Sequence, residues 1–479
     1  MRYGKNPSLP VALIASALVL GLPAAAFATS DLQMPGAELS LFWTIPFVGM
    51  LLSVAFAPLF VPHFWHKHFG KVAVFWCLTF VIPCLLVYGP EVALFHVWET
   101  LSHEYIPYTI ILLALFTIAG GVRVTGTLVG TPKVTTGIIL IGTILASWMG
   151  TTGASMLLIR PLLRAIAHRK YRVHSVIFFI ILVSNIGGSL SPLGDPPLFM
   201  GFLKGVDFFW PTVHLFPSLV FMVVPLLLMY FALDTYLFNK EGRPEPPAEA
   251  IATAGEKFGL EGKANLLLLL GVLGAVLMSG TFKLGSFEIY HVELYVQALL
   301  RDAILLGLVF LSLKVTTQEN RRLNEFNWFP IQEVAKVFFG IFITMTPTIL
   351  ILQAGDKGAL AALLNTVNYN GQPVNIAYFW ITGFLSCWLD NVPTYMVYFN
   401  IAGADPVELM GPLADTLVAL SVGTIFFGAM TYIANAPNFM VRSIAETQGV
   451  PMPSFFGYFF RCVLILWPIF IVYSLIFFR

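Results

Sequence analysis

The sequence has little charge. Of its 479 residues only 11% are Asp, Glu, Lys or Arg, whereas 58% are hydrophobic, and the formal net charge is +1. Such a composition cannot cover the surface of a water-soluble domain with polar groups. It also provides no basic stripe for nucleic acid. The composition therefore excludes a soluble protein and a nucleic-acid partner, and it predicts a membrane protein.

Motifs of soluble enzymes are also missing. The chain contains no GxxxxGK[ST] phosphate loop, no HExxH and no GxSxG. Its few cysteines lie in apolar runs without a CxxC pair, so we interpret them as small apolar filler rather than disulfide partners or metal ligands. We therefore expect no enzyme, no cofactor and no ATP-driven transport by this chain alone. The cysteines are Cys77, Cys84, Cys387 and Cys462.

Long apolar runs are what the sequence has instead. A run of about 18 or more apolar residues can cross roughly 30 Å of hydrocarbon as a helix. We predict an all-α polytopic membrane protein with about ten transmembrane helices. The predicted spans are about 41–62, 72–90, 105–121, 174–200, 213–238, 264–282, 295–313, 336–353, 411–440 and 455–478.

The N-terminus is typical of an export signal. Arg2 and Lys5 precede an apolar core, and the small-residue sequence Ala26-Phe27-Ala28 precedes Thr29. We predict a signal peptide at residues 1–28, with an uncleaved anchor helix as the alternative. Lys and Arg gather in alternate loops, which places those loops in the cytoplasm and favours a bacterial inner membrane. These loops are 63–71, 160–172, 239–263 and 314–330.

Two further apolar segments, about 134–160 and 376–403, are interrupted midway by small, polar or helix-breaking residues. The alternation of charged loops works only if each segment enters and leaves the membrane on the same side. We therefore predict two re-entrant hairpins. The polar, proline-rich stretch 239–263 reads as a cytoplasmic linker between a first transmembrane repeat, 41–238, and a second, 264–479.

The chain repeats itself at an offset of 240 residues. LASWMGTTGASM at 145–156 falls on LSCWLDNVPTYM at 385–396, and GSLSPLGDPPLFM at 188–200 falls on GAMTYIANAPNFM at 428–440. The number of predicted spans between the two hairpins is odd, so the hairpins enter from opposite faces. Two homologous halves of inverted topology predict a secondary transporter with its site near the bilayer midplane.

Four breaks in these segments are expected to converge. Backbone that is not helical at membrane depth leaves N–H and C=O groups unpaired, unless protein or a cavity satisfies them. Hydroxyls, amides, freed carbonyls and two carboxylates are the hard ligands that suit a small cation such as Na⁺. The breaks are the hairpin tips at 150–153 and 390–394 and the unwound points at 191–197 and 431–437.

The two carboxylates at these breaks are Asp195 and Asp390. A carboxylate in a membrane segment costs about 2.5–3.5 kcal/mol on insertion scales, which makes an idle one rare. The alternative is that each Asp caps the half-helix that follows it. Capping and ion binding can coexist.

These residues carry a resemblance to a known group of proteins. NIGGSLSPLGDPPL, at 185–198, resembles a segment of the ion transporter superfamily, which includes NhaD-type sodium/proton antiporters, divalent-anion/sodium symporters, and arsenite and citrate permeases. LDNVPT at 389–394 and NAPN at 435–438 resemble the second-half tip and break of that superfamily. The Asp after Gly194, together with Asp390-Asn391, looks most like the NhaD type.

The resemblance implies re-entrant hairpins, a scaffold with the contacts of a possible homodimer, and a moving part that carries the ions. The first tip departs from the NhaD pattern, because it has no carboxylate. A neutral tip at a helix N-terminus also suits an anion, which Thr151 and Thr152 would meet. The implied cation-site residues are Asp390, Asn391, Thr394, Asp195, Ser191, Asn435 and Thr431, with Asp390 and Asp195 as the direct Na⁺ ligands.

Two functions remain open at this point. The first is an antiporter that exchanges Na⁺ or Li⁺ for H⁺ by alternating access, with Asp390 as the principal carboxylate and Asp195 assisting. The second is a cation-coupled symporter of citrate or another carboxylate. A channel, a membrane-embedded enzyme or a receptor is a third class, and the inverted repeat argues against it. The expected partners are the lipid bilayer, small cations and protons, and in the second case a carboxylate anion.

Overall fold

The computed structural model describes residues 32–126, 128–244, 259–324 and 326–478. Helices dominate this part of the chain, and ten of them are long and apolar enough to cross a membrane. The prediction of an all-α polytopic membrane protein with about ten transmembrane helices is therefore confirmed. The predicted signal peptide, 1–28, lies outside the described residues.

The helices alternate with short connections, and many begin with a proline in the first turn, where a missing N–H costs nothing. In chain order they are η2 (Leu41–Thr44), α2 (Ile45–Phe60), α3 (Pro62–Tyr88), α4 (Pro90–Thr100), the π-helix η3 (Leu101–Tyr105), α5 (Ile106–Ala119), α6 (Pro132–Met149), α7 (Thr151–Ala165), α8 (Val173–Leu182), η4 (Ile186–Leu190), α9 (Pro196–Leu203), α10 (Trp210–His214), α11 (Phe216–Lys240), α13 (Lys263–Thr281), α14 (Val296–Val315), α15 (Gln318–Leu323), α16 (Phe329–Gln353), η5 (Gly355–Lys357), α17 (Ala361–Val367), α18 (Asn375–Trp388), α19 (Asn391–Ile401), α20 (Pro406–Met410), α21 (Ala414–Phe427), η6 (Gly428–Met430), α22 (Ala436–Thr447) and α23 (Phe455–Phe477).

Strands occur in the described residues only as three antiparallel pairs. The first pair joins the chain before α6 to the end of the predicted linker, with Arg123 opposite Glu261 and their side chains 3.1 Å apart. The predicted linker, 239–263, thus lies between the end of α11 and the start of α13, and its last residues are held on β1. The strands are β1 (Arg123–Thr125) with β2 (Gly259–Glu261), β3 (Ser286–Ile289) with β4 (Val292–Tyr295), and β5 (Asn368–Tyr369) with β6 (Gln372–Pro373).

The candidate spans differ from the predicted ones in one respect. Nine of the ten overlap predicted spans, and the tenth, Pro132–Met149, is the first arm of the segment 134–160 predicted as a hairpin. The predicted span 411–440 instead holds the shorter apolar helix Ala414–Met430. It is shorter because the backbone leaves the helix at Thr431, one of the expected breaks.

Two stretches expected as loops are helical. Residues 63–71 form the start of α3, and 91–104 lie within one helix that runs from 90 to 119 through the π-turn η3. In the first stretch, Trp65 is buried and its indole N–H donates to Glu333 on α16 at 3.0 Å. Polar residues marked both stretches as loops, but their apolar faces pack against neighbouring helices, which extends the helices.

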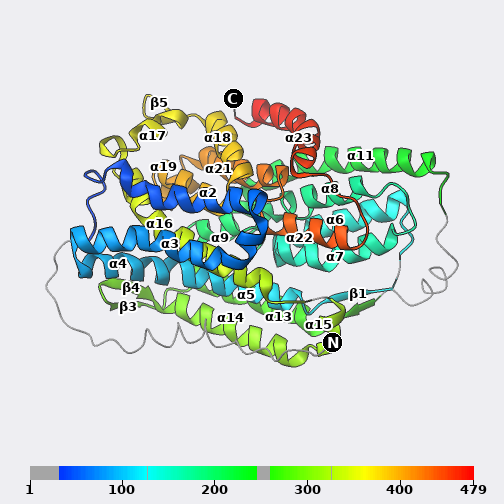
Figure 1. Cartoon of the computed structure of the whole chain (residues 1–479), viewed down its shortest axis with the longest axis horizontal. Helices are drawn as coiled ribbons and strands as arrows, with labels where there is room; N and C mark the ends of the chain where they lie inside the picture. Colours follow the sequence, from blue (N-terminus) through cyan, green and yellow to red (C-terminus); the bar gives the residue numbers. More distant parts are fainter. Residues whose placement is uncertain (1–31, 127, 245–258, 325, 479) are drawn as a thin grey trace.

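The helices form two contacting groups. In the first group α5, α13 and α14 pack on one another, and α2, α3 and α16 do the same. Figure 1 shows α4, α5, α13 and α14 along one side of the molecule. In the second group α6, α7, α8, α11 and α22 pack together, and α18 packs against α19 and α21. The groups meet where α5 contacts α7 and α16 contacts α19.

The most enclosed spans lie at the centre. The window over Val173–Leu190 is 83% buried and that of Phe329–Gln353 is 61% buried, whereas the other spans are 22–44% buried. The first of these spans leads directly into the unwound point at 191–195. The unwound point at 191–195 therefore follows the most buried of the candidate spans.

Candidate functional site

Two helix pairs turn sharply at their tips. α6 passes into α7 at Gly150, and α18 passes into α19 through Leu389 and Asp390. Gly150 has a φ of +81°, a conformation that glycine adopts without a side-chain penalty, whereas Asp390 has an ordinary φ of −88°. The first tip therefore favours glycine at the position that the 240-residue offset pairs with a carboxylate. Whether the pairs are re-entrant in a membrane stays a prediction.

Two unwound points follow the same design. A short 3₁₀ turn, η4 or η6, ends at an extended residue, Ser191 or Thr431, and a new helix starts at Pro196 or Ala436. The first point folds tightly on itself: a Cβ on Gly194 would lie 2.1 Å from the carbonyl oxygen of Gly188. Glycine is required at position 194 because no side chain fits between this residue and the backbone of Gly188.

Hydroxyl groups fix both unwound points to the neighbouring hairpin. Ser191 donates to the carbonyl oxygen of Ser147 near the end of α6, and Thr431 donates to that of Cys387 near the end of α18 at 2.6 Å. The 240-residue offset relates both donors and both acceptors. The hydroxyls of Ser191 and Thr431, both predicted as cation ligands, therefore lie in backbone contacts that hold the breaks in place.

Removing one of these hydroxyls should destabilise the fold. Thr431→Val keeps the shape but leaves a buried carbonyl without its donor, and we expect a loss of about 1–3 kcal/mol in the free energy of unfolding. Thermal unfolding of the purified protein in detergent measures it. Thr366→Val is the matched control, because Thr366 also donates to a helix carbonyl, at 2.6 Å, but is exposed. Equal stability of the two variants would contradict the assignment.

Asp195 is the centre of the polar contacts. Its side chain accepts from the amides of Asn391 and Asn435, each at 3.2 Å, and from the hydroxyl of Thr151 at 3.3 Å. The residue is only 1% exposed, and it makes no cap bond to its own helix α9. The capping alternative is therefore wrong for Asp195. One carboxylate instead connects the first tip, the second tip and both unwound points.

Asp390 is used differently. Its carboxylate accepts from the backbone N–H of Val392 at 3.0 Å, so it caps α19, and the hydroxyl of Thr394 donates back to the Asp390 carbonyl at 3.0 Å. Capping is thus observed for Asp390 and not for Asp195. The side chain of Asp390 is half-buried and keeps a second carboxylate oxygen for another ligand.

The four breaks surround one partly open cavity of about 100 Å³. Five predicted site residues line it, and Asp195 lies directly behind three of them. Ser191, Thr394 and Thr431 do not line it. Among the described residues, no group of three or more His, Cys, Asp or Glu could hold a metal ion, so a cation here would need amide, hydroxyl or carbonyl oxygens besides a carboxylate. The five lining residues are Thr151, Thr152, Asp390, Asn391 and Asn435.

Sequence reasoning missed three residues of the network. Asn185 donates to Asn438 at 2.7 Å and accepts from Asn435, which joins the two halves behind the cavity. Ser386 donates to the side-chain oxygen of Asn391 at 2.8 Å and so orients the amide that faces Asp195. Each is a buried polar residue close to a break in apolar sequence, and that was the available signal.

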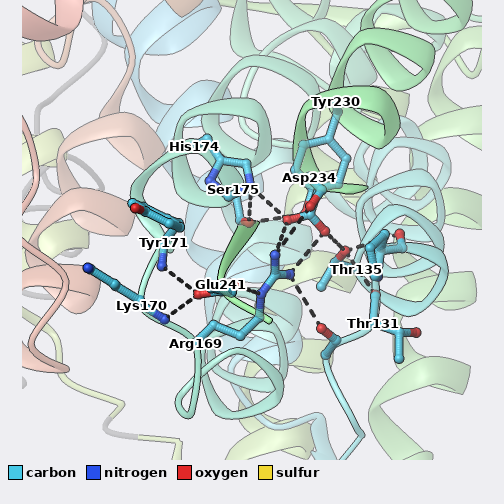
Figure 2. Close-up of polar contacts among 12 residues, drawn as sticks. Thr131, Thr135, Arg169, Lys170, Tyr171, His174, Ser175, Tyr230, Asp234 and Glu241 are labelled. Atoms are coloured by element: carbon cyan, nitrogen blue, oxygen red, sulfur yellow. Dashed lines mark hydrogen bonds and ion pairs between the residues drawn. The ribbon is translucent and has the colours of Figure 1, made fainter. Parts of the chain in front are cut away.

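A second buried polar cluster lies away from the cavity, between α6, α8 and α11 (Figure 2). The guanidinium of Arg169 contacts Asp234 at 2.7 Å and Glu241 at 3.1 Å. Thr135 and His174 also bond to Asp234, at 2.8 and 2.7 Å. Since charges out of water need such partners, this cluster ties the start of the first helix pair to the end of α11.

Breaking this cluster should be costly. Asp234→Asn leaves a fully buried guanidinium without its closest carboxylate, and we expect a loss of about 3–5 kcal/mol in the free energy of unfolding. Glu319→Gln is the control, because it removes an exposed partner of Arg322 and should leave the free energy of unfolding nearly unchanged. Thermal unfolding in detergent compares the two, and similar losses would refute a structural role for the cluster.

One comparison with known proteins gives a match. A model of the CitMHS_2 family, described as "putative citrate transport", matches residues 36–478, which is nearly the whole chain. No curated protein matches the chain.

Proposed function

The chain belongs to the CitMHS_2 family, a family of membrane transport, and we propose that it is a secondary transporter that exchanges Na⁺ or Li⁺ for protons. The family indicates a permease rather than an enzyme, and the apolar helices make it a multi-pass membrane protein. A bacterial inner-membrane location, a homodimer and an NhaD-type mechanism are parts of the proposal.

The charge of the cavity carries this proposal. Asp390 lines the cavity and Asp195 lies behind its wall, while none of the described residues that line it is Lys, Arg or His. A poorly solvated site with uncompensated carboxylates attracts cations or protons. Citrate, which carries up to three negative charges at neutral pH, would be repelled there unless cations bound with it.

The partners of Asp195 support exchange on one carboxylate. All three are neutral, and two are amides whose oxygen and nitrogen exchange places when the side chain turns over. With the amide nitrogens inward, the two Asn side chains donate hydrogen bonds to a bare carboxylate. With the amide oxygens inward, they complete a cation site or accept a hydrogen bond from the protonated acid. Cation and proton therefore exclude one another, which is the condition for exchange.

Cation-coupled transport of a carboxylate is the second candidate. The first tip supports this candidate. The helix α7 begins after Gly150 with no side-chain cap, and residues of this tip line the cavity. At the second tip, by contrast, Asp390 caps α19. The backbone N–H of Thr151 already donates to the carbonyl oxygen of Gly194 at 2.9 Å, and the N–H groups that follow it at the helix start can bind an anion. The family description agrees with this reading.

Transport by the purified protein in proteoliposomes that contain a pH-sensitive dye tests the proposal. With an imposed proton gradient, Na⁺ or Li⁺ without citrate should change the internal pH, and K⁺ should have little effect. A pH change that requires both citrate and Na⁺ would support the second candidate. No response to any cation, with or without citrate, would contradict both.

A further inference from the structure

A second pocket lies beyond the buried polar cluster, where the start of α8, the end of α11 and the start of α23 meet. Its volume is about 400 Å³, and it is partly open to the outside. Its polar part comes from the chain before and within the first turn of α8, with Lys170, Arg172 and His174, and from Arg461 on α23. None of the described residues that line it is Asp or Glu.

The carboxylates nearest to this pocket already have partners. Asp234 and Glu241 both bind Arg169 on the inner side (Figure 2), and Glu241 also accepts the backbone N–H groups of Lys170 and Tyr171. Glu446 pairs with Arg442 at 2.9 Å. Lys170, Arg172 and Arg461 are therefore left without a carboxylate partner among the described residues, whereas His174 binds Asp234 at 2.7 Å.

These cations are held near the pocket but remain accessible. Lys170 and Arg461 are exposed, and Arg172 is half-buried with its guanidinium 2.7 Å from the carbonyl of Gly449. The ammonium of Lys240 lies 6.0 Å from the ring of Tyr171 and 5.8 Å from that of Tyr236. Lysines beside tyrosines at a helix end are typical of a membrane interface.

The rest of the pocket is apolar and faces outward. Leu464 is 78% exposed and Leu233 37% exposed, although both belong to candidate membrane spans. An anion with a hydrocarbon tail matches this combination, whereas a free anion would leave the apolar wall uncovered. Apolar residues of the lining include Ile177, Phe178, Leu233, Leu237, Leu464 and Ile465.

We propose that this pocket binds an anionic phospholipid. The headgroup phosphate lies between Lys170, Arg172 and Arg461, and the acyl chains run along the exposed leucines of α11 and α23. The site lies at the end of the first helix pair, where Arg169 joins it to α11. The proposal is independent of the transported ion.

Lipid binding by the full-length protein tests this site. The purified protein in neutral detergent is titrated with phosphatidylglycerol, with phosphatidylcholine of the same chains, and with inorganic phosphate, while native mass spectrometry counts bound lipid and thermal unfolding reports stabilisation. We expect one phosphatidylglycerol bound in preference to phosphatidylcholine. In the double variant Lys170→Gln/Arg461→Gln its affinity should fall about tenfold or more, since each basic residue contributes to anionic lipid binding.

The double variant Lys67→Gln/Lys71→Gln is the matched control. It removes two exposed lysines from α3, at a distance from the pocket lining, and should bind phosphatidylglycerol as the wild type does. Unchanged lipid affinity in Lys170→Gln/Arg461→Gln would overturn the proposal. Equal stabilisation by inorganic phosphate, or equal binding of phosphatidylcholine, would also overturn the assignment of an anionic lipid.

Discussion

Replacing Asp195 with Asn should abolish Na⁺-evoked proton movement in proteoliposomes while leaving the protein folded. Asn has the same shape and can still bond to Thr151, Asn391 and Asn435, so the contacts between the breaks survive. It cannot carry the charge that attracts a cation or release a proton. Because a buried carboxylate without a basic partner is itself costly, the thermal stability should stay equal or rise.

Asp415→Asn is the control for this experiment. Asp415 lies in the first turn of α21 and is exposed, so its neutralisation should leave transport at the wild-type rate. If Asp195→Asn transports as fast as Asp415→Asn, the carboxylate of Asp195 has no part in exchange.

Substitution of Asp390 should have the second large effect on transport. Two different substitutions can separate its role as a helix cap from its role in ion binding. Asn caps helices about as well as Asp, so Asp390→Asn should keep the bond to Val392 and the stability of α19, yet lose Na⁺-evoked proton movement in inverted vesicles. Asp390→Ala removes both, and it should lose transport and about 1 kcal/mol of stability. Full activity of Asp390→Asn would reduce the residue to a helix cap.

The carboxylates of Asp195 and Asp390 have different roles. Asp195 holds the breaks together through neutral donors, and Asp390 presents its free oxygen at the cavity while capping α19. If only Asp195→Asn loses transport, one carboxylate suffices for exchange and Asp390 is structural. If both lose it, exchange requires both carboxylates.

Much of the fold could be predicted from apolar length alone. A run such as 216–240 has to be a membrane helix because no other structure satisfies its backbone in lipid. Residues 91–104 could not be predicted in this way. Their Glu and His residues suggest a loop, but a polar face can be shielded by packing: His96, only 1% exposed, accepts the backbone N–H of Met34.

The site was predictable in its location and less so in its chemistry. The 240-residue repeat identified both tips and both unwound points, because glycine, proline and carboxylates in apolar sequence are rare and informative. Which oxygen of each break faces the cavity depends on side-chain rotation, which the sequence does not encode locally. Thus Ser191 turns to the backbone of α6, whereas Asn391 turns to Asp195.

Na⁺ binding to the purified protein as a function of pH tests the central claim most directly. If Na⁺ and H⁺ compete for one carboxylate, the apparent Na⁺ affinity should fall by up to about tenfold for each unit that the pH is lowered through the titration range, without citrate. The same dependence should disappear in Asp195→Asn. A Na⁺ affinity that is independent of pH, or that exists only when citrate is added, would contradict exchange at this site.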